Sequence, residues 1–356
     1  MFKSQNPLLP GWLSALLSVS FVLASFAVVV FAYLTLQVIW TQAVNPVEAA
    51  AADVAAVELQ LEQEGPPDLQ PLAPGEPTPT LIPTSEARAA DERTNILVMG
   101  IDRRPGESFI SRTDSMMLVS IDAQNNQAAI LSIPRDLYAL IPGYGRDRIN
   151  TAFVYGSANN DPAGGAALAM STVEYNLGVP VDHYVLVDFS AVIKGIDTLG
   201  GIDVYVPYDI NDPSYPDMDY GYDPLFIPAG LQHMDGQTGL KYARTRHVDN
   251  DFGRATRQQQ VLLAARDKAL GLGITGLLAR APELYQRVEQ GIRTDLSLEQ
   301  LVGLATAGSK IDSDSIRNEV LDQRFVSPFV TDQGSQVLVL DPDAATVLID
   351  ELFYSE

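Results

Sequence analysis

Residues 95–101 read NILVMGI, residues 115–121 read SMMLVSI and residues 128–133 read AAILSI. Each is a short, almost continuous apolar run bounded by turn residues. A strand that is covered on both faces has no polar side to show to water, so such runs predict a sheet buried between two layers. Similar runs occur at residues 184–187, 203–206 and 337–340.

Helical patterns lie between these runs, at residues 165–176, 188–198, 254–270 and 298–310. Strands that alternate with helices predict an α/β fold, here an α+β sandwich with a central mixed sheet flanked by helices. Few linker signals interrupt residues 95–356. We therefore expect this segment to form one domain.

Two aspartates stand at the ends of the first two predicted strands. Asp102 follows the first strand and Asp114 precedes the second. Ligands gather at strand ends in open α/β sheets, and the two carboxylates would face each other if the strands are antiparallel. Two carboxylates with room for water and phosphate can hold Mg²⁺. The alternative is that both aspartates only cap turns.

Four arginines fall within 14 residues, at Arg244, Arg246, Arg254 and Arg257. Arg244 and Arg246 alternate as on a strand, which predicts that they point to the same side. Guanidinium groups match phosphate oxygens in paired hydrogen bonds. The alternative is a set of surface salt bridges with the many local carboxylates.

A helix that begins near Gly253 would place Arg254, Arg257 and Gln258 on one face. The free N–H groups of its first turn would favour an anion at the same place. Arg135 ends the third strand, in the stretch ILSIPRDLY (130–138), and adds a further cation at that edge of the sheet. Carboxylates for a divalent ion beside several arginines are what phosphoryl transfer requires.

Composition excludes several other kinds of site. The 356 residues include no cysteine and three histidines, which rules out disulfides, cysteine nucleophiles and thiolate zinc sites and disfavours a histidine cage. The chain has 45 acidic and 23 basic residues. Nonspecific nucleic-acid binding depends on basic side chains, so we expect no nucleic-acid partner.

The N-terminal region predicts a membrane anchor. Residues 13–39 carry no charge, and Trp12 and Trp40 bracket them. A bilayer core about 30 Å thick needs about 20 apolar residues, whereas the apolar region of a cleaved signal peptide is shorter. Lys3 precedes the span and no basic residue follows it before Arg88, so the positive-inside bias places the N-terminus in the cytoplasm.

The sequence thus predicts three segments. Residues 1–40 form a cytoplasmic tip and a single-pass transmembrane anchor in the cell membrane. Residues 41–94 are rich in proline and acidic side chains, which predicts an extended extracellular linker. Residues 95–356 form the extracellular catalytic domain.

Seven motifs resemble the LytR-CpsA-Psr family in order and spacing, across about residues 94–270. They are ILVMGIDRR (96–104), SRTDSMMLVSID (111–122), ILSIPRDLY (130–138), RINTAFVYG (148–156), GGIDVYVP (200–207), PAGLQHMDGQTGLKYARTRH (228–247) and DFGRATRQQQ (251–260). A single N-terminal span is also usual for that family. The insert NDPSYPDMDYGYDPL (211–225) lies where the family varies.

The resemblance implies a Mg²⁺-dependent phosphotransferase, with Mn²⁺ as the second choice of metal. It would move a glycopolymer from a polyprenyl-pyrophosphate carrier to a peptidoglycan hydroxyl and form a phosphodiester. By motif position, the metal ligands would be Asp102 and Asp114, and the catalytic residues Arg135, Asp114 and Arg254. The residues at the pyrophosphate would be Arg112, Arg135, Arg244, Arg246, Arg254, Arg257 and Gln258.

Other functions stay open at this point. The protein would alternatively bind or hydrolyse polyprenyl pyrophosphate in the envelope, or act as a membrane-bound transcriptional attenuator. Over residues 95–356 the 35 acidic and 20 basic residues oppose the last of these. Asp136 and Asp251 are both candidates for a general base, and the sequence does not choose between them. Nor does it fix an oligomeric state.

Overall fold

The computed structural model describes residues 93–354, apart from 104–106, 159–160, 217–220 and 247. All the described residues fall in one compact unit. The predicted membrane anchor and residues 41–92 of the predicted linker lie outside them, so these predictions stay predictions. Among the described residues, no helix combines the length and the apolar character needed to cross a bilayer.

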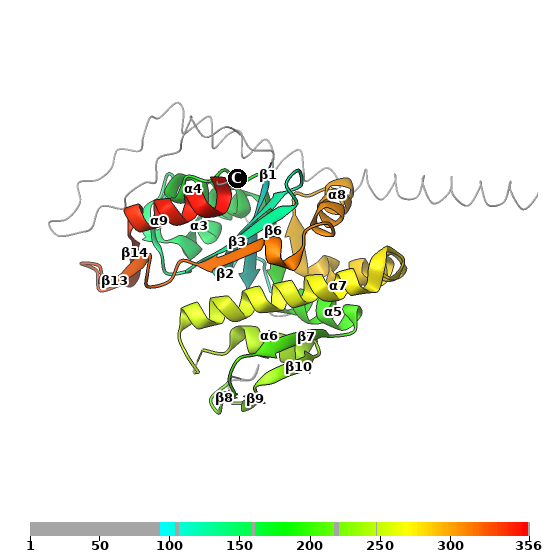
Figure 1. Ribbon diagram of the computed structural model, residues 1–356. Coiled ribbons are helices and arrows are strands. Elements are labelled where there is room, and N and C mark those ends of the chain that lie inside the picture. Colours follow the sequence, from blue (N-terminus) through cyan, green and yellow to red (C-terminus); the bar gives the residue numbers. More distant parts are fainter. Residues whose placement is uncertain (1–92, 104–106, 159–160, 217–220, 247, 355–356) are drawn as a thin grey trace, which may run out of the picture. The chain divides into compact units, whose positions relative to one another are not determined.

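A six-stranded mixed sheet forms the centre of the described chain (Figure 1). Its strands, in spatial order, are β11 (Ile292–Thr294), β6 (His183–Asp188), β1 (Arg93–Ile101), β2 (Thr113–Asp122), β3 (Gln127–Ile133) and β12 (Ile316–Val320). The β1/β6 and β3/β12 pairs are parallel and the other three are antiparallel. The predicted central mixed sheet is confirmed.

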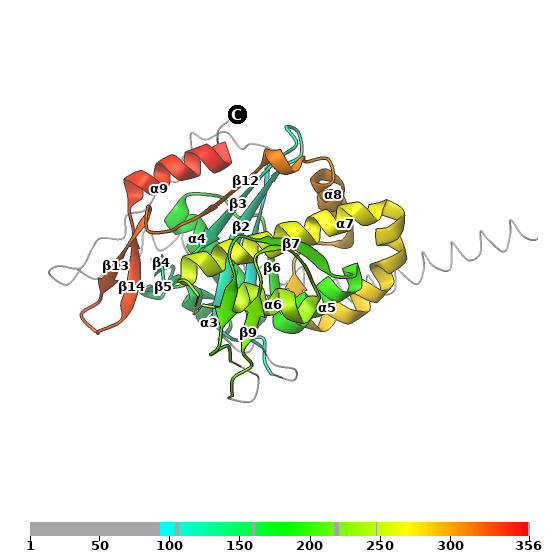
Figure 2. The ribbon, with the colours of Figure 1, turned by 60° about the horizontal axis from the view of Figure 1, so that its bottom comes forward.

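Helices cover both faces of this sheet (Figure 2). The helices on one face are α3 (Ala152–Gly156), α4 (Pro162–Leu177) and α9 (Pro342–Ile349). Those on the other are α5 (Phe189–Leu199), α6 (Gly236–Arg244), α7 (Asp251–Val288) and α8 (Leu298–Gly308). The four predicted helices are thus present, as α4, α5, α7 and α8. The prediction for α7 ended at Leu270, and its helical geometry breaks nearby at Gly273, where φ is 63°.

Two predicted strands form outside the central sheet. Their small sheets are β7 (Ile202–Val206) with β10 (Gly230–Met234), and β14 (Gln336–Leu340) with β13 (Val326–Val330). Two more hairpins pair β4 (Tyr138–Ile141) with β5 (Gly145–Arg148), and β8 (Ile210–Asp212) with β9 (Leu225–Ile227). Side chains on β7 alternate between buried and exposed, because only one face of that ribbon packs on a core.

The two faces of the central sheet differ in burial. Leu97, Met99 and Leu118 point toward α3 and α4 and are fully buried. On the opposite face, Val98 and Val119 are only half-buried. One side of the sheet is therefore a closed core, and the other leaves apolar surface partly uncovered.

The helices α3 and α4 approach each other through glycines. A Cβ on Gly156 would lie 2.5 Å from the carbonyl oxygen of Gly164 and 2.7 Å from Cβ of Leu168. Neither atom is the end of a flexible side chain, so a larger residue would push the helices apart. This contact sets how closely α4 covers the sheet.

We expect Gly156→Ala to lower the free energy of unfolding by about 1–3 kcal/mol, the usual cost of overpacking. The matched control is Gly303→Ala in α8, because a Cβ there meets no atom within 4 Å. That change should be neutral or stabilising by up to about 1 kcal/mol. Chemical denaturation of both variants tests the contact, and equal stabilities would contradict it.

Candidate active site

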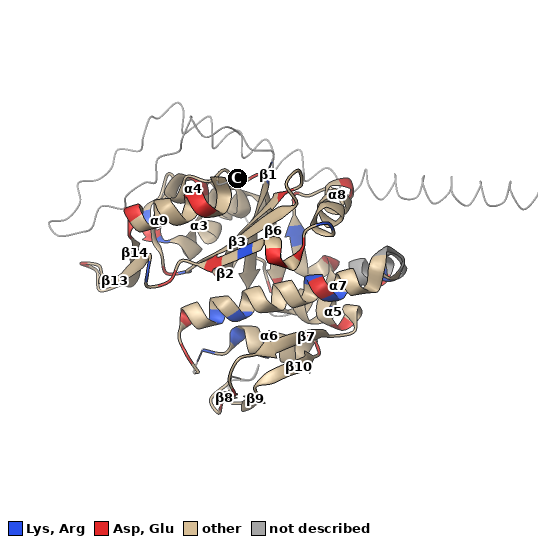
Figure 3. Cartoon of the chain, in the orientation of Figure 1, with Lys and Arg blue, Asp and Glu red and all other residues tan. Residues whose placement is uncertain are grey.

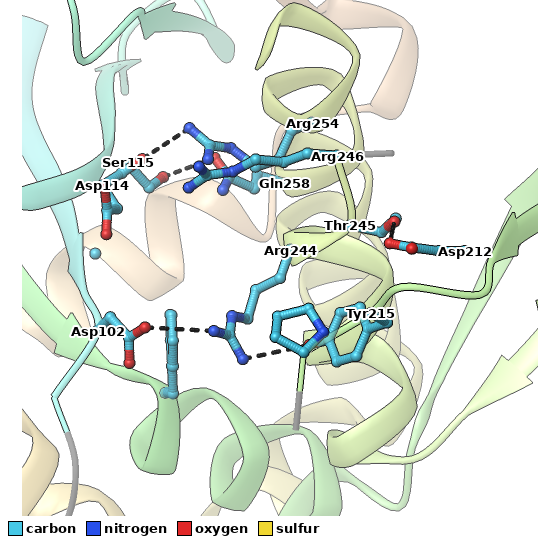
Figure 4. A pocket seen from close by; sticks show the side chains of 13 residues that line it. Asp102, Asp114, Ser115, Asp212, Tyr215, Arg244, Thr245, Arg246, Arg254 and Gln258 are labelled. Carbon is cyan, nitrogen blue, oxygen red and sulfur yellow. Dashed lines mark hydrogen bonds and ion pairs between the residues drawn. The ribbon is translucent and has the colours of Figure 1, made fainter. Parts of the chain in front are cut away.

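A pocket of about 320 Å³ opens at the ends of β1 and β2. The end of β8 with the loop after it, the start of α5, the end of α6 and the start of α7 also contribute to its wall. Figure 3 shows Lys and Arg positions on α6 and on the first turns of α7. Six predicted site residues line it: Asp102, Asp114, Arg244, Arg246, Arg254 and Gln258. The structure therefore brings together residues that are up to 156 positions apart in the predicted motifs (Figure 4).

The antiparallel pairing of β1 with β2 places both aspartates at the pocket. Gly100 pairs with Ser115 and Ile101 pairs with Thr113, so Asp114 is an extra residue on β2. Such a bulge bends the strand and redirects a side chain. The exposed Asp102 follows directly after β1, and both carboxylates line the same pocket.

Arg244 and Arg246 both line the pocket, but they do not lie on a strand as predicted. Arg244 is the last residue of helix α6, and no strand forms here, so the expected strand alternation is wrong. Its guanidinium lies 4.2 Å from the ring centre of Phe189 and 3.3 Å from a carboxylate oxygen of Asp102. Arg246 is exposed, and its Nε lies 3.7 Å from Asp251.

The residue Arg254 is the buried cation of the site, with 5% of its surface exposed. Its Nη2 donates to the backbone oxygen of Asp114 at 3.1 Å, but its buried Nε has no acceptor among the described residues. Burial lowers the pKa of Arg254 to about 10, which keeps the group charged at neutral pH. A buried cation with an unused N–H is suited to an anionic ligand.

Gln258 lies one helical turn after Arg254 and fixes the neighbouring wall. Its Oε1 accepts a hydrogen bond from the hydroxyl of Ser115 at 2.8 Å, and its Nε2 donates to the carbonyl of Ala243 at 3.3 Å. These bonds connect the first turns of α7 to β2 and α6. Gln258 therefore positions three elements around the pocket.

Arg135 lies beside this pocket and lines a smaller one of about 20 Å³ that shares Asp114 and Arg254 with it. Its Nη1 donates to Asp114 at 2.5 Å, and its Nε lies 3.2 Å from Asp251. Burial by itself would lower the pKa of Arg135, but the hydrogen bond to Asp114 and the surrounding carboxylates raise it overall. Arg135 is thus a permanent positive charge at the carboxylate Asp114.

The carboxylate of Asp251, in the first turn of α7, contacts three of these arginines. It lies 3.2 Å from Arg135, 3.2 Å from Arg254 and 3.7 Å from Arg246. Its carboxylate oxygens are therefore already engaged by three guanidinium groups. We assign it a positioning role, which leaves the general base open.

Two predicted residues line neither of these two pockets. Arg257 is 3% exposed and binds Asp249 together with the carbonyls of Tyr242 and Thr245. It holds the segment between α6 and α7 instead of facing the pocket. Arg112 is exposed and is not among the lining residues.

Sequence reasoning missed other lining residues. Phe189 supports Arg244, and it follows the end of β6, so the strand-end rule could have found it. Thr245 donates its hydroxyl to Asp212 at 2.5 Å, and both are fully buried. No motif pointed to that bond, because its partners are 33 positions apart.

The fit of a metal ion depends on Asp102 and Asp114. Among the described residues, no three His, Cys, Asp or Glu side chains gather as a complete metal cage. Mg²⁺ is often bound by one or two carboxylates, with waters and phosphate oxygens filling the remaining positions. The two aspartates suit an ion that is shared with a phosphate ligand.

Comparison with known proteins places this architecture in a family. The model of the LytR_cpsA_psr family matches residues 57–351. Polyisoprenyl-teichoic acid–peptidoglycan teichoic acid transferase TagU of Oceanobacillus iheyensis is 33% identical over 217 residues, which are 60% of this chain. The match spans 62% of that relative.

Two solved structures share the fold. The crystal structure of Bacillus subtilis TagV has a TM-score of 0.58 and 27% identity, over 75% of this chain and 99% of that one. TagT bound to LI-WTA has a TM-score of 0.58 and 27% identity, over 73% of this chain and 89% of that one. The chain belongs to the LytR-CpsA-Psr family.

Proposed function

We propose that this protein transfers a glycopolymer from a polyprenyl-pyrophosphate carrier to a hydroxyl of peptidoglycan. The observation that carries the proposal is the buried Nε of Arg254, which has no acceptor among the described residues. Arg254 lines a pocket together with two more arginines and with the predicted metal ligands Asp102 and Asp114. The relative TagU carries the name of a polyisoprenyl-teichoic acid–peptidoglycan transferase, and TagT has been solved with LI-WTA. These names support the same class of donor and acceptor here.

In the proposed reaction, the acceptor hydroxyl oxygen forms a bond to the phosphorus that carries the glycan. The bond from that phosphorus to the carrier's phosphate oxygen breaks, and polyprenyl phosphate leaves. The hydroxyl proton passes to water. Arg244, Arg246 and Arg254 would bind the non-bridging and leaving oxygens, where negative charge develops. A loose transition state of this kind needs little help from a base.

Mg²⁺, or Mn²⁺ in its place, would be held by Asp102 and Asp114. Bound there, the ion would neutralise phosphate charge and polarise the phosphorus centre. Arg135 would hold the carboxylate of Asp114 in place through its 2.5 Å hydrogen bond. Asp251 would in turn hold Arg135 and Arg254 side by side.

The carrier's lipid would lie along the less covered face of the sheet. Val98, Val119 and Val185 on this face are half-buried, and they come from the three neighbouring strands β1, β2 and β6. Burying the remaining apolar surface under a polyprenyl chain would be worth about 25 cal/mol per Å². The predicted single-pass anchor would keep the domain outside the cell, beside the membrane that holds such a carrier.

Asp114→Asn should slow transfer by roughly 10²–10³, because the change removes the negative charge that would hold the metal and that pairs with Arg135. Removal of Mg²⁺ by a chelator should cause a similar loss in the wild type. The measurement is the initial rate at which the full chain, in detergent, transfers radiolabelled glycan from the lipid-linked donor to peptidoglycan. Asp267→Asn, at an exposed carboxylate on α7, is the control. A folded Asp114→Asn variant with the wild-type rate would remove Asp114 from the mechanism.

Alanine substitutions of Arg246 and Arg257 should differ in whether they change the transfer rate or the free energy of unfolding. Arg246 is exposed in the pocket, so Arg246→Ala should reduce transfer and leave the free energy of unfolding unchanged. Arg257→Ala should lower the free energy of unfolding by about 3–5 kcal/mol, because it leaves Asp249 and two carbonyls without their partner. Denaturation curves and transfer rates of both variants separate the two roles. A stable Arg257→Ala protein that has lost transfer would contradict this assignment.

A further inference from the structure

A second cavity, of about 290 Å³, lies on the other side of the first turns of α7. The helix contributes Phe252 and Thr256 to its wall, β12 contributes Asn318 and Glu319, and the loop after β12 contributes Gln323 and Arg324. No step of the proposed transfer uses any of these six residues. We call this cavity the α7–β12 groove.

The α7–β12 groove connects to the active-site pocket. The small pocket at Arg135 shares Asp114 and Arg254 with the active site, and shares Phe252 and Val320 with the groove. The three cavities therefore follow the edge of the sheet, from the ends of β1 and β2, past β3, to β12. The middle one, at about 20 Å³, has room for a hydroxyl group but not for a sugar ring.

The lining of the groove suits an uncharged ligand rich in hydroxyl and amide groups. Arg324 lines the groove, and its guanidinium is already paired with Glu319 at 2.7 Å and with Asp322 at 2.9 Å. Asn318 and Gln323 supply amides, and Phe252 supplies an aromatic surface. With its cation neutralised, the groove has little attraction for a polyanion, whereas amides and an aromatic ring suit a sugar chain.

The wall of the groove is fixed before any ligand arrives. Gln259 is 1% exposed and lies between α7, β3 and β12. Its Nε2 donates to the hydroxyl of Ser132 at 2.9 Å and to the carbonyl of Glu319 at 2.7 Å. Its Oε1 accepts a hydrogen bond from Asn318 at 3.3 Å. A site held in this way loses little freedom when it binds.

We propose that the α7–β12 groove binds the acceptor of the reaction, a neutral chain of N-acetylated sugars, and presents one of its hydroxyls to the active site past Arg135. The proposal rests on the proposed function. The in-line displacement requires the hydroxyl to approach opposite the leaving polyprenyl phosphate. The lipid is expected over β6, β1 and β2, and the groove lies at the far side of the pocket, at β3 and β12.

A tryptophan in the groove tests this assignment. Thr256 is exposed on α7 and faces the groove, so Thr256→Trp fills the cavity without changing Arg254 or Gln258. We expect the KM for peptidoglycan to rise roughly 10-fold or more, a loss of about 1.4 kcal/mol in acceptor binding. Binding of polyprenyl pyrophosphate should stay at the wild-type level. Gln323→Trp, in the exposed loop, repeats the test in case the helical variant misfolds.

A surface tryptophan elsewhere is the matched control. Val347 is 59% exposed on α9, across the sheet from the groove, so Val347→Trp should leave the KM unchanged. All measurements use the full chain in detergent. If both groove variants are folded and transfer glycan with the wild-type KM, the groove proposal is overturned while the proposed function stands.

A binding assay separates the groove from the proposed chemistry. The probe is chitotetraose, a neutral tetramer of N-acetylglucosamine, followed by saturation-transfer NMR. Binding to the wild type that Thr256→Trp and Gln323→Trp abolish would support the groove as a sugar site, even if the wild type transfers no glycan. Chitotetraose binding that both tryptophans leave intact, or no binding by the wild type, would contradict it.

Discussion

The site depends on one balance of charge, in which carboxylates hold several guanidinium groups side by side. Arg135, Arg246 and Arg254 would repel one another in a partly dry pocket, and Asp251 offsets that repulsion by contacting all three. Asp114 binds Arg135 from the other side. The arrangement is close to neutral in itself, so an incoming diphosphate with its cation can join it without a large change in net charge.

The sequence predicted the layers of the fold better than the connections between them. β1, β2 and β3 are nearly continuous apolar runs, since both faces of the central sheet carry helices. The run at β7 looked similar, but its Tyr205 is 67% exposed and the strand belongs to a separate ribbon. A short apolar stretch does not say which sheet it joins, because that choice depends on contacts far away in the sequence.

Part of the site was predictable from motif spacing alone. Six of the nine predicted site residues line the active-site pocket, and a seventh, Arg135, lines the adjoining one. The face of α7 that was predicted to bind phosphate was broader than the face that lines the pocket. Arg254 and Gln258 are about 40° apart around a helix of 3.6 residues per turn, whereas Arg257 and Gln258 are about 100° apart. Helical spacing therefore places Arg257 close enough to share a face with Arg254 and Gln258. Its side chain nevertheless binds the carbonyl of Tyr242 and the carboxylate of Asp249 instead of lining the pocket. The Asp212–Thr245 hydrogen bond and the α7–β12 groove both join segments that are far apart in the sequence. No local sequence pattern could therefore predict either of them.

The extra residue in β2 has a consequence for how this architecture can change over time. Asp114 is the position that interrupts regular pairing with β1. A deletion of this one codon would leave Thr113 and Ser115 to pair without interruption, so the sheet would become more regular as the carboxylate vanished. Regular pairing of β1 with β2 therefore does not require Asp114. A homologue without this residue would keep the fold but lose a carboxylate of the site, and would then bind sugars or lipids without transferring them.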